Sequence, residues 1–144
     1  EGEGKKRKMI NQRKRAKRAI GPGRLEISIK YKNISQPVNN GGSMETGSYL
    51  LMGKKEAQKE TFASNAHGSG RIMSRTKAKR MFRGETLYKD MLKEGIYVKS
   101  VSYTGLAEEA GDAYKNIDDV VDATVNAKIS KRVVRFIPIG NVKG

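Results

Sequence analysis

The sequence predicts an α+β protein in which helices flank a mixed sheet. In residues 25–30, apolar and polar side chains alternate, which favours a half-buried strand. In residues 85–94, apolar side chains recur at helical spacing, which favours an amphipathic helix. Strand-like and helix-like segments do not alternate strictly along the chain. This order favours an α+β arrangement over a doubly wound one.

Local patterns predict the individual elements in chain order. The first half of the chain has a turn at Gly21-Pro22-Gly23, a strand at 25–29, a loop at 33–47, a buried strand at 48–52 and a short helix at 54–62. The second half has a loop at 63–70, helices at 71–82 and 85–94, a strand at 96–103, a helix at 117–128 and a strand at 132–139. Gly95 follows the second of these helices in the C′ position, and Asn116 is the expected N-cap of the last helix.

Positive charge is concentrated in one part of the chain. The net charge is +15. Residues 1–83 hold 21 basic and 6 acidic residues, whereas residues 84–144 hold 9 of each. Residues 5–24 contain ten basic residues and no acid, and residues 71–83 contain six and no acid. Such blocks attract polyanions, so the sequence predicts a nucleic-acid partner. We therefore divide the chain into a basic arm, residues 1–24, and a main region, residues 25–144.

Composition excludes several classes of function. The chain has no cysteine and one histidine, which excludes disulfide scaffolds, thiol nucleophiles and metal sites built from several imidazoles. The longest uncharged run, residues 33–44, is far shorter than a membrane span, and no membrane partner is expected. No apolar leader opens the chain, so we expect a cytoplasmic or other intracellular location. The first residue is Glu1 rather than Met, which suggests processing or a missing N-terminal part.

The single histidine lies in a glycine-rich loop, His67-Gly68-Ser69-Gly70. Two glycines let the backbone approach a ligand closely, and a helix directly after them would offer free N–H groups to a phosphate. Arg71 and Arg75 would then lie one turn apart on the same helix face. An imidazole can attack phosphorus to form a phosphoramidate. The pattern favours a phosphate cradle with a nucleophile, and the alternative is a loop histidine beside a glycine turn.

The wider sequence resembles the RtcB family of RNA ligases. Residues 66–75, AHGSGRIMSR, are similar to the family signature HGAGRxMSR. Further similar stretches occur in the family's order and cover nearly the whole chain: RAIGPGR at 18–24, YKNISQPV at 31–38, GSMETGSY at 42–49, AYKNID at 113–118 and NVKG at 141–144. The resemblance covers the C-terminal third of a typical member, and it implies the fold of that part.

The resemblance implies a chemistry and a set of site residues. The family joins an RNA 3′-phosphate or 2′,3′-cyclic phosphate end to a 5′-hydroxyl end, using GTP and Mn²⁺. His67 matches the histidine that forms a histidine–GMP intermediate, and Lys14 and Arg75 match positions that bind phosphates of the RNA. Positions that contact the guanine nucleotide fall on Ser43, Ser48, Ser69, Gly70, Tyr114 and Lys143. The implied partner is RNA, such as tRNA halves.

The chain also departs from the family pattern. The family's Mn²⁺ ligands lie in a part that this sequence lacks, so no metal ligand is expected here. Gln12, Arg15 and Lys17 stand where the family has His, Gly and Thr, and Glu45 replaces a glycine. A carboxylate at Glu45 would repel a nearby phosphate unless it faces solvent. These changes suggest a shift from catalysis towards bulk affinity for RNA.

Two functions therefore remain open from the sequence. The first is an RNA ligase in which the rest of the polypeptide, or another protein, supplies the metal-binding part; alone, the chain would be inactive. The second is a non-catalytic RNA-binding protein of a ribonucleoprotein particle, descended from such a ligase. A degenerate fragment without function is a third possibility.

Overall fold

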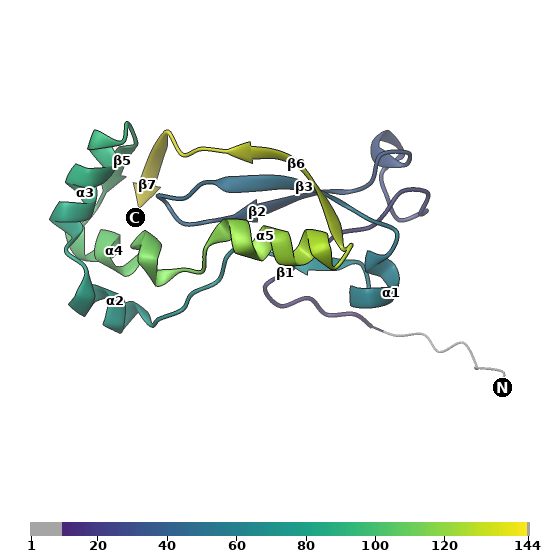
Figure 1. The fold of residues 1–144 in the computed structure, drawn as a ribbon, viewed down its shortest axis with the longest axis horizontal. Coiled ribbons are helices and arrows are strands. Elements are labelled where there is room, and N and C mark those ends of the chain that lie inside the picture. The colour runs from purple at the N-terminus through teal and green to yellow at the C-terminus, as the bar shows by residue number, and fades with distance from the viewer. Residues whose placement is uncertain (1–9, 144) are drawn as a thin grey trace.

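The computed structural model describes residues 10–143, and it confirms the α+β class. The first part of the basic arm, including the run Lys5–Lys8, lies outside the described residues. Figure 1 shows an elongated molecule in which the central sheet and helix α5 (Ile117–Asn126) occupy one part and helices α2 (Arg75–Met81), α3 (Gly84–Lys93) and α4 (Tyr103–Glu108) occupy the other. No helix of residues 10–143 is long and apolar enough to cross a membrane.

A three-stranded antiparallel sheet forms the centre, with strand order β2 (Pro37–Gly41), β3 (Ser48–Gly53) and β6 (Ser130–Phe136). Along β3, every second residue is buried, which is the pattern of a sheet covered on one face. Helix α5 (Ile117–Asn126) covers that face (Figure 1). The first core consists of Ala19, Val38, Tyr49, Leu51, Ile117 and Val121, all of them buried.

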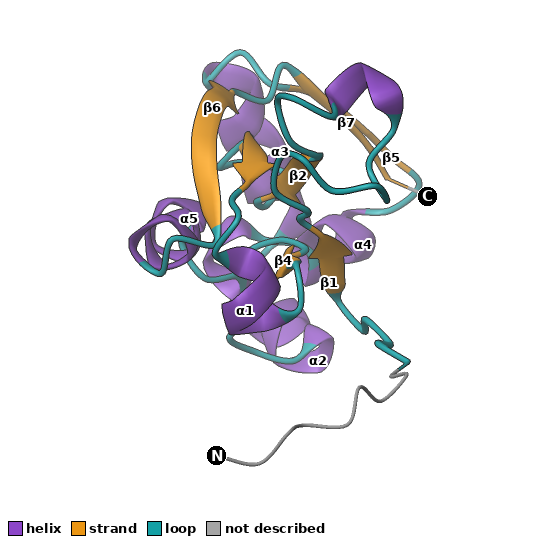
Figure 2. Cartoon of the chain, turned by 90° about the vertical axis from the view of Figure 1, so that its right-hand side faces the viewer, coloured by secondary structure: helices purple, strands orange, loops and turns teal. Residues whose placement is uncertain are grey.

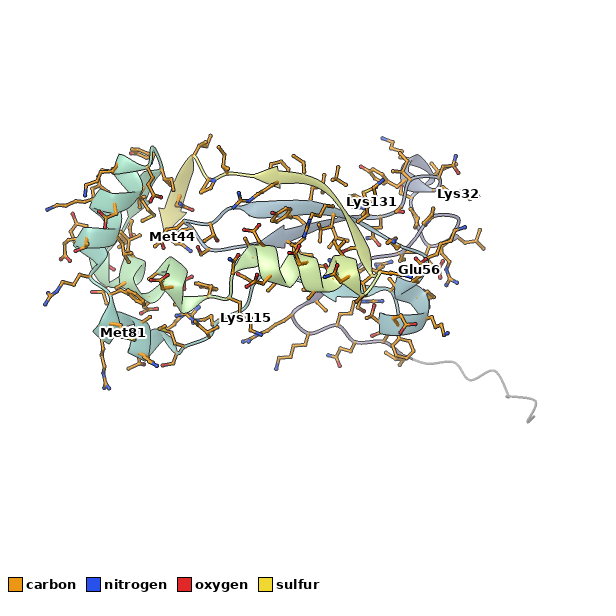
Figure 3. All side chains as sticks on the ribbon, viewed as in Figure 1. Lys32, Met44, Glu56, Met81, Lys115 and Lys131 are labelled. Carbon is orange, nitrogen blue, oxygen red and sulfur yellow. The ribbon has the colours of Figure 1, made fainter. Side chains whose placement is uncertain are left out.

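A second core lies where the short helices meet the hairpin between β2 and β3. Helices α3 and α4 pack against β5 (Tyr97–Ser100), which forms a parallel pair with β7 (Gly140–Lys143), and α2 packs against α4. Met44, at the tip of the hairpin and labelled in Figure 3, belongs to this core together with Met91, Ile96, Val98 and Leu106. The hairpin therefore connects the sheet to the helical part.

A short antiparallel pair attaches the basic arm to the rest of the fold. Strand β1 (Ala16–Arg18) pairs with β4 (Ser64–Ala66), and helix α1 (Ala57–Thr61) precedes β4. Figure 2 shows this pair beside the central sheet. Directly after β1, Ala19 and Ile20 are buried. Part of the arm is thus ordered against the glycine-rich loop that follows β4.

Several predicted elements are confirmed. Helix α3 lies within one residue of its predicted start and end, and Gly95 has a positive φ of 78° after its end. Asn116 caps α5 because its side-chain oxygen accepts a hydrogen bond from the Asp118 backbone N–H at 2.8 Å. The buried strand at 48–52 is β3, and the last predicted strand is present as β6.

Four predictions are wrong or incomplete. The stretch at 25–29 is a turn leading into the short 3-10 helix η1 (Ile29–Tyr31), because only Ile27 of its apolar residues is buried. The loops predicted at 33–47 and 63–70 contain β2 and β4, whose polar sequences form strands through pairing with distant segments. The strand predicted at 96–103 ends at Ser100, because Ser102 caps helix α4 by accepting a hydrogen bond from Gly105. A further 3-10 turn, η2 (Gly111–Ala113), precedes α5.

Candidate functional site

A pocket of about 660 Å³ surrounds the glycine-rich loop after β4. His67 is exposed at this pocket, and the Oγ atom of Ser69 is buried there. Four polypeptide segments that are far apart in the sequence meet at its walls. The lining residues are Arg15, Lys17, Asn39, Gly41, Gly42, His67, Gly68, Ser69, Gly70, Arg71, Arg75 and Tyr114.

The loop that carries His67 lies against the edge of β2 and has little freedom. The Ser69 backbone N–H donates to the Gly41 carbonyl at 2.9 Å, and the Gly41 N–H donates to the His67 carbonyl at 3.4 Å. A Cβ atom on Gly68 would lie 2.6 Å from the Gly41 carbonyl oxygen, so a side chain there would displace the loop. The close contact of the two backbones therefore requires glycine at position 68.

The pocket contains polar groups that fit an anionic, hydrogen-bonding ligand. The Ser69 hydroxyl is buried and has no hydrogen-bond partner among residues 10–143. Buried hydroxyl groups are nearly always hydrogen-bonded, so an unmatched one in a pocket wall is available to a ligand. Gly70 has a φ of 72°. Its carbonyl accepts a hydrogen bond from the Lys115 backbone N–H at 2.9 Å, which fixes the loop on its other side.

Arg71 is the most extensively bonded side chain at the site. Its guanidinium donates to the Met73 carbonyl at 3.0 Å, to the Tyr114 hydroxyl at 2.9 Å and to the Glu108 carbonyl at 2.7 Å. The same guanidinium lies 4.8 Å from the centre of the Tyr114 ring. Arg71 therefore occupies one face of this ring and joins the glycine-rich loop to α4.

Glu109 gathers the charged groups at this end of the pocket. The Tyr114 hydroxyl donates to its carboxylate, and the cationic nitrogens of Arg71, Arg75 and Lys143 lie 3.5–3.6 Å from it. Burial raises the pKa of Glu109, but the hydrogen bond and the three cations outweigh it, so the pKa lies below its ordinary value. Burial, and next the bond to Glu109, raise the pKa of Tyr114. Glu109 is thus charged, and it holds Tyr114 and Lys143 together.

The prediction that Arg71 and Arg75 share one helix face is wrong. Helix α2 begins at Arg75, with Ser74 as its N-cap, whereas Arg71 precedes it in an extended segment bridged to Tyr114. The positive φ of Gly70 and the hydrogen bond from Ile72 N–H to the Ala113 carbonyl, 2.9 Å, keep this segment out of the helix. The two guanidinium groups still converge, because both reach Glu109.

The basic arm forms the other wall of the pocket. Lys17 lies on β1, and its ammonium group donates to the Asn39 carbonyl at 2.8 Å. Arg15 also lines the pocket and has a φ of 57°, a conformation that favours glycine. Lys14 is exposed next to it but does not line the pocket. No carboxylate of residues 10–143 forms an ion pair with any of these three side chains.

The structure brings five of the nine sequence-predicted site residues to one pocket: His67, Ser69, Gly70, Arg75 and Tyr114. Lys143 joins them only indirectly, through Glu109. The other three lie outside the lining. Ser43 is engaged in a turn, where its hydroxyl accepts hydrogen bonds from the backbone N–H groups of Glu45 and Thr46, each at 3.2 Å. Ser48 begins β3 and pairs with Gly41 of the pocket wall.

The Glu45 carboxylate is partly buried and is bonded to the backbone of a distant segment. It accepts a hydrogen bond from the Gly111 backbone N–H, and burial raises its pKa more than this bond lowers it. This contact connects the hairpin tip to η2, which leads to Tyr114. The side chain that replaces a family glycine therefore serves as a brace between two segments of the site.

Sequence reasoning missed several residues of the site. The charge run of the arm could have indicated Arg15 and Lys17, because it contains no acid. Asn39, Gly41 and Glu109 carry no local signal. Their roles depend on the pairing of β2 with β3 and on the packing of α4, which are contacts between distant segments.

The described residues do not offer a site for Mn²⁺. Among residues 10–143, no group of three or more His, Cys, Asp or Glu side chains could hold a metal ion. The two carboxylates nearest the pocket, Glu108 and Glu109, are paired with cations. No step of the chemistry is therefore assigned to a metal held by these residues.

The fold and the site define an α+β protein with a polar pocket that is lined by cationic side chains and contains an exposed histidine. The family model described as tRNA-splicing ligase RtcB matches residues 1–144. A protein from Archaeoglobus fulgidus named tRNA-splicing ligase RtcB is 49% identical over 99% of this chain. Proteins of the same name from Pyrococcus abyssi and Nanoarchaeum equitans are 48% and 46% identical over 100% and 99% of the chain. The chain belongs to the RtcB family.

The chain spans only part of the length of these relatives. It covers 30% of the proteins from Archaeoglobus fulgidus and Nanoarchaeum equitans, and 16% of the protein from Pyrococcus abyssi. More than two thirds of each relative therefore lies outside the region of similarity.

Proposed function

We propose that this chain is the nucleotide-accepting part of an RtcB-type RNA ligase, and that His67 carries the guanylyl group during ligation. The substrates would be an RNA 3′-phosphate or 2′,3′-cyclic phosphate end and a 5′-hydroxyl end, in an intracellular compartment. The observation that carries the proposal is the exposed His67 imidazole in a pocket with cations on two sides and a buried, unmatched Ser69 hydroxyl. Membership of the RtcB family supports the same function.

His67 is suited to the role of nucleophile. Its backbone is held by the β2 edge, but its side chain is exposed, so an incoming phosphorus atom can reach it. An imidazole nitrogen would attack the α-phosphorus of GTP, the bond to the bridging oxygen would break, and pyrophosphate would leave. GTP supplies the activated guanylyl group, and this chain supplies the acceptor and the groups that bind and orient the nucleotide.

The cations have two different tasks in this proposal. Arg71 and Lys143 lie beside Glu109 and Tyr114, where they would bind and orient the guanine nucleotide and its phosphates. Guanidinium groups bind phosphate oxygens bidentately, which fixes direction as well as charge. Arg75, which also reaches Glu109, would bind a phosphate of the RNA together with Lys14, Arg15 and Lys17 of the arm. Arg75 would thus lie where the GTP and RNA sites meet at His67.

Mn²⁺ does not fit the donors of this chain and would have to be held by the part of the ligase that this chain does not span. That part, on the same or another polypeptide, is the partner that the proposal requires.

The alternative is a non-catalytic RNA-binding protein. It is favoured by the arm cations without ion pairs and by Arg15, which holds a glycine-like conformation and adds charge.

The experiment uses a chimera in which this chain replaces the matching 142 residues of the Archaeoglobus fulgidus relative. The chimera is incubated with GTP, Mn²⁺ and RNA fragments that end in a 2′,3′-cyclic phosphate and a 5′-hydroxyl group. We expect joined RNA, and a loss of at least about 10³-fold in the His67→Ala chimera, because the nucleophile is gone.

A control variant and two measurements of folding make this result decisive. The matched control is Ser74→Ala, which changes a nearby exposed hydroxyl group that only caps α2. Circular dichroism and thermal unfolding of all chimeras establish that they are folded. A folded chimera that binds RNA but joins none, with or without His67, would contradict the ligase and support the non-catalytic alternative.

A further inference from the structure

One face of the central sheet is uncovered. Helix α5 covers the face that contains Tyr49 and Leu51, but no helix of residues 10–143 lies over the opposite face at β6. Leu50 lies on this second face, with Asn39 as its Cα partner on β2 and Val134 as its partner on β6. An open antiparallel sheet tolerates water on one face, and that face is then usually polar. Here it also carries the apolar side chains of Leu50, Val134 and Phe136.

Apolar side chains gather on β6 and the segment after it. Within residues 133–142, six large apolar side chains are exposed: Val133, Val134, Phe136, Ile137, Ile139 and Val142, with exposed fractions from 42% to 80%. We call these six residues the β6 surface. Isolated exposed apolar residues are common, but six within ten residues of chain are unusual, and exposed apolar groups of this kind can mark an interface.

The outer edge of β6 is also free. In the strand order β2-β3-β6, β6 has a partner on one side only, and Figure 2 shows it at the outer side of the sheet. The exposed edge of a strand offers unpaired N–H and C=O groups to another strand. Val133 and Val134 on such an edge would invite pairing, and β6 has no proline to prevent it.

Two rows of paired residues connect the β6 surface to the His67 pocket. The first row runs from Asn39 through Leu50 to Val134, and the second runs from Gly41 through Ser48 to Phe136. Residues paired across antiparallel strands point to the same face. Asn39 and Gly41 line the pocket, so Val134 and Phe136 lie two strand spacings, about 10 Å, from its wall.

We propose that the β6 surface is where the remaining part of the ligase packs, by adding a strand to the free edge of β6 and covering the open sheet face. This inference rests on the proposed function. The occupant is inferred from the length of the relatives. More than two thirds of the Archaeoglobus fulgidus relative lies outside the region that matches this chain, and that part needs a surface on which to pack. A polypeptide on Val134 and Phe136 would lie two strand spacings from Asn39 and Gly41 of the pocket wall, close enough to extend that wall.

Hydrogen exchange tests the strand addition directly. The backbone amides of residues 130–136 are compared in the isolated chain and in the chimera with the Archaeoglobus fulgidus relative. We expect the amides on the free edge of β6 to exchange at least about 100-fold more slowly in the chimera, because they become paired. Residues 24–28, which form a turn on another surface, serve as the internal control and should change little. Equal exchange of β6 in both proteins would overturn the proposal.

Two substitutions test the apolar contact. Phe136→Asp should lower the midpoint of thermal unfolding of the chimera by roughly 5 °C or more, because a charge would be buried at the new interface. Its effect on the isolated chain should be much smaller, since this side chain is 48% exposed there. Leu25→Asp is the matched control, because Leu25 is 89% exposed and does not belong to the β6 surface. Similar effects of both substitutions in the chimera would contradict the proposal.

The outcome is separable from that of the ligase assay. A chimera that protects β6 but never joins RNA keeps this inference and refutes the proposed function. A chimera that joins RNA while β6 stays unprotected and Phe136→Asp has no effect refutes this inference alone. The other candidates to cover the β6 surface are a second copy of this chain and RNA. Light scattering of the isolated chain tests for a dimer, and RNA titration of the Phe136→Asp variant tests for RNA. A dimer that dissociates on this substitution, or an RNA affinity that depends on Phe136, would each overturn the proposal.

Discussion

The two cationic groups at the His67 pocket differ in how their charge is balanced. On the α4 side, Arg71, Arg75 and Lys143 share the carboxylate of Glu109. On the arm side, Lys14 and Arg15 have no ion pair with any carboxylate of residues 10–143. The charge of the first group is balanced within the fold, whereas the charge of the second is not balanced by any of these carboxylates. If the proposed function is correct, the first group would orient a bound ligand and the second would attract one.

The largest expected difference concerns stability. Arg71→Ala removes three hydrogen bonds and the contact with Tyr114, so we expect a loss of about 2–4 kcal/mol in the free energy of unfolding. Arg75→Ala removes only long ion pairs of a side chain that is 68% exposed, and should change stability by less than about 0.5 kcal/mol. Urea denaturation of the isolated chain measures both. Equal losses would remove the distinction between a bonded and a solvent-exposed arginine.

The next difference concerns RNA binding and salt. Lys14→Ala and Arg15→Ala should each reduce the slope of log affinity against log salt by about 0.7 for single-stranded RNA, because each removes one phosphate contact. Glu60→Gln, on α1, is a control that changes charge by the same amount and should raise affinity only slightly. Fluorescence anisotropy at several salt concentrations measures the slope. A slope that stays constant in both arm variants would show that the arm does not contact RNA.

A third difference separates the two neighbouring carboxylates. The pKa of Glu109 is lowered in the folded chain, so its ionised form contributes stability at neutral pH. This contribution is fully present above the ordinary pKa of 4.5 and is lost as pH falls through the lower folded pKa. Glu109→Gln should therefore destabilise the chain at pH 7 and much less at low pH. Glu108→Gln, which affects only the outer pairs to Arg75 and Lys79, should show a smaller effect.

Chemical denaturation of Glu109→Gln and Glu108→Gln between pH 3 and pH 7 compares their free energies of unfolding. The same samples report on Tyr114, whose raised phenol pKa should fall in Glu109→Gln because the acceptor loses its charge. An ultraviolet titration follows that ionisation. A Tyr114 titration that is the same in both variants would show that Glu109 does not position this ring.

The smallest expected effect concerns Arg15. Its φ of 57° is strained for any residue except glycine and, to a lesser degree, asparagine. Arg15→Gly should therefore raise the free energy of unfolding by about 0.5–1 kcal/mol while it weakens RNA binding. Lys17→Thr should weaken RNA binding without this gain in stability. An Arg15→Gly chain that is more stable and binds RNA equally well would contradict the idea that charge has replaced glycine to increase RNA affinity.

Prediction from sequence succeeded where the signal is local. The cap at Asn116 and the positive φ of Gly95 depend on neighbouring residues, and both ends of α3 were predicted closely. It failed for β2, because Asn39, Asn40 and Gly41 are poor strand formers and become a strand only by pairing with β3. The alternation at 25–29 was misleading, because Leu25 and Ile29 are exposed.

The same distinction applies to the site. The loop from His67 to Gly70 was evident from its glycines and from the family resemblance. The resemblance also placed Tyr114 at this site. The convergence of Arg15 and Asn39 on the loop could not be predicted, because it depends on the pairing of β1 with β4 and of β2 with β3. Glu109 had no signal of its own, and its importance follows only from the four groups that contact it.

The most direct test of the central claim is to locate the guanylyl group. The chimera is treated with GTP and Mn²⁺ in the absence of RNA, digested under conditions that preserve phosphoramidates, and analysed by tandem mass spectrometry. The account predicts a GMP adduct on the peptide that contains His67, and no adduct in His67→Ala. A folded chimera without an adduct, or with one on a lysine instead, would contradict it.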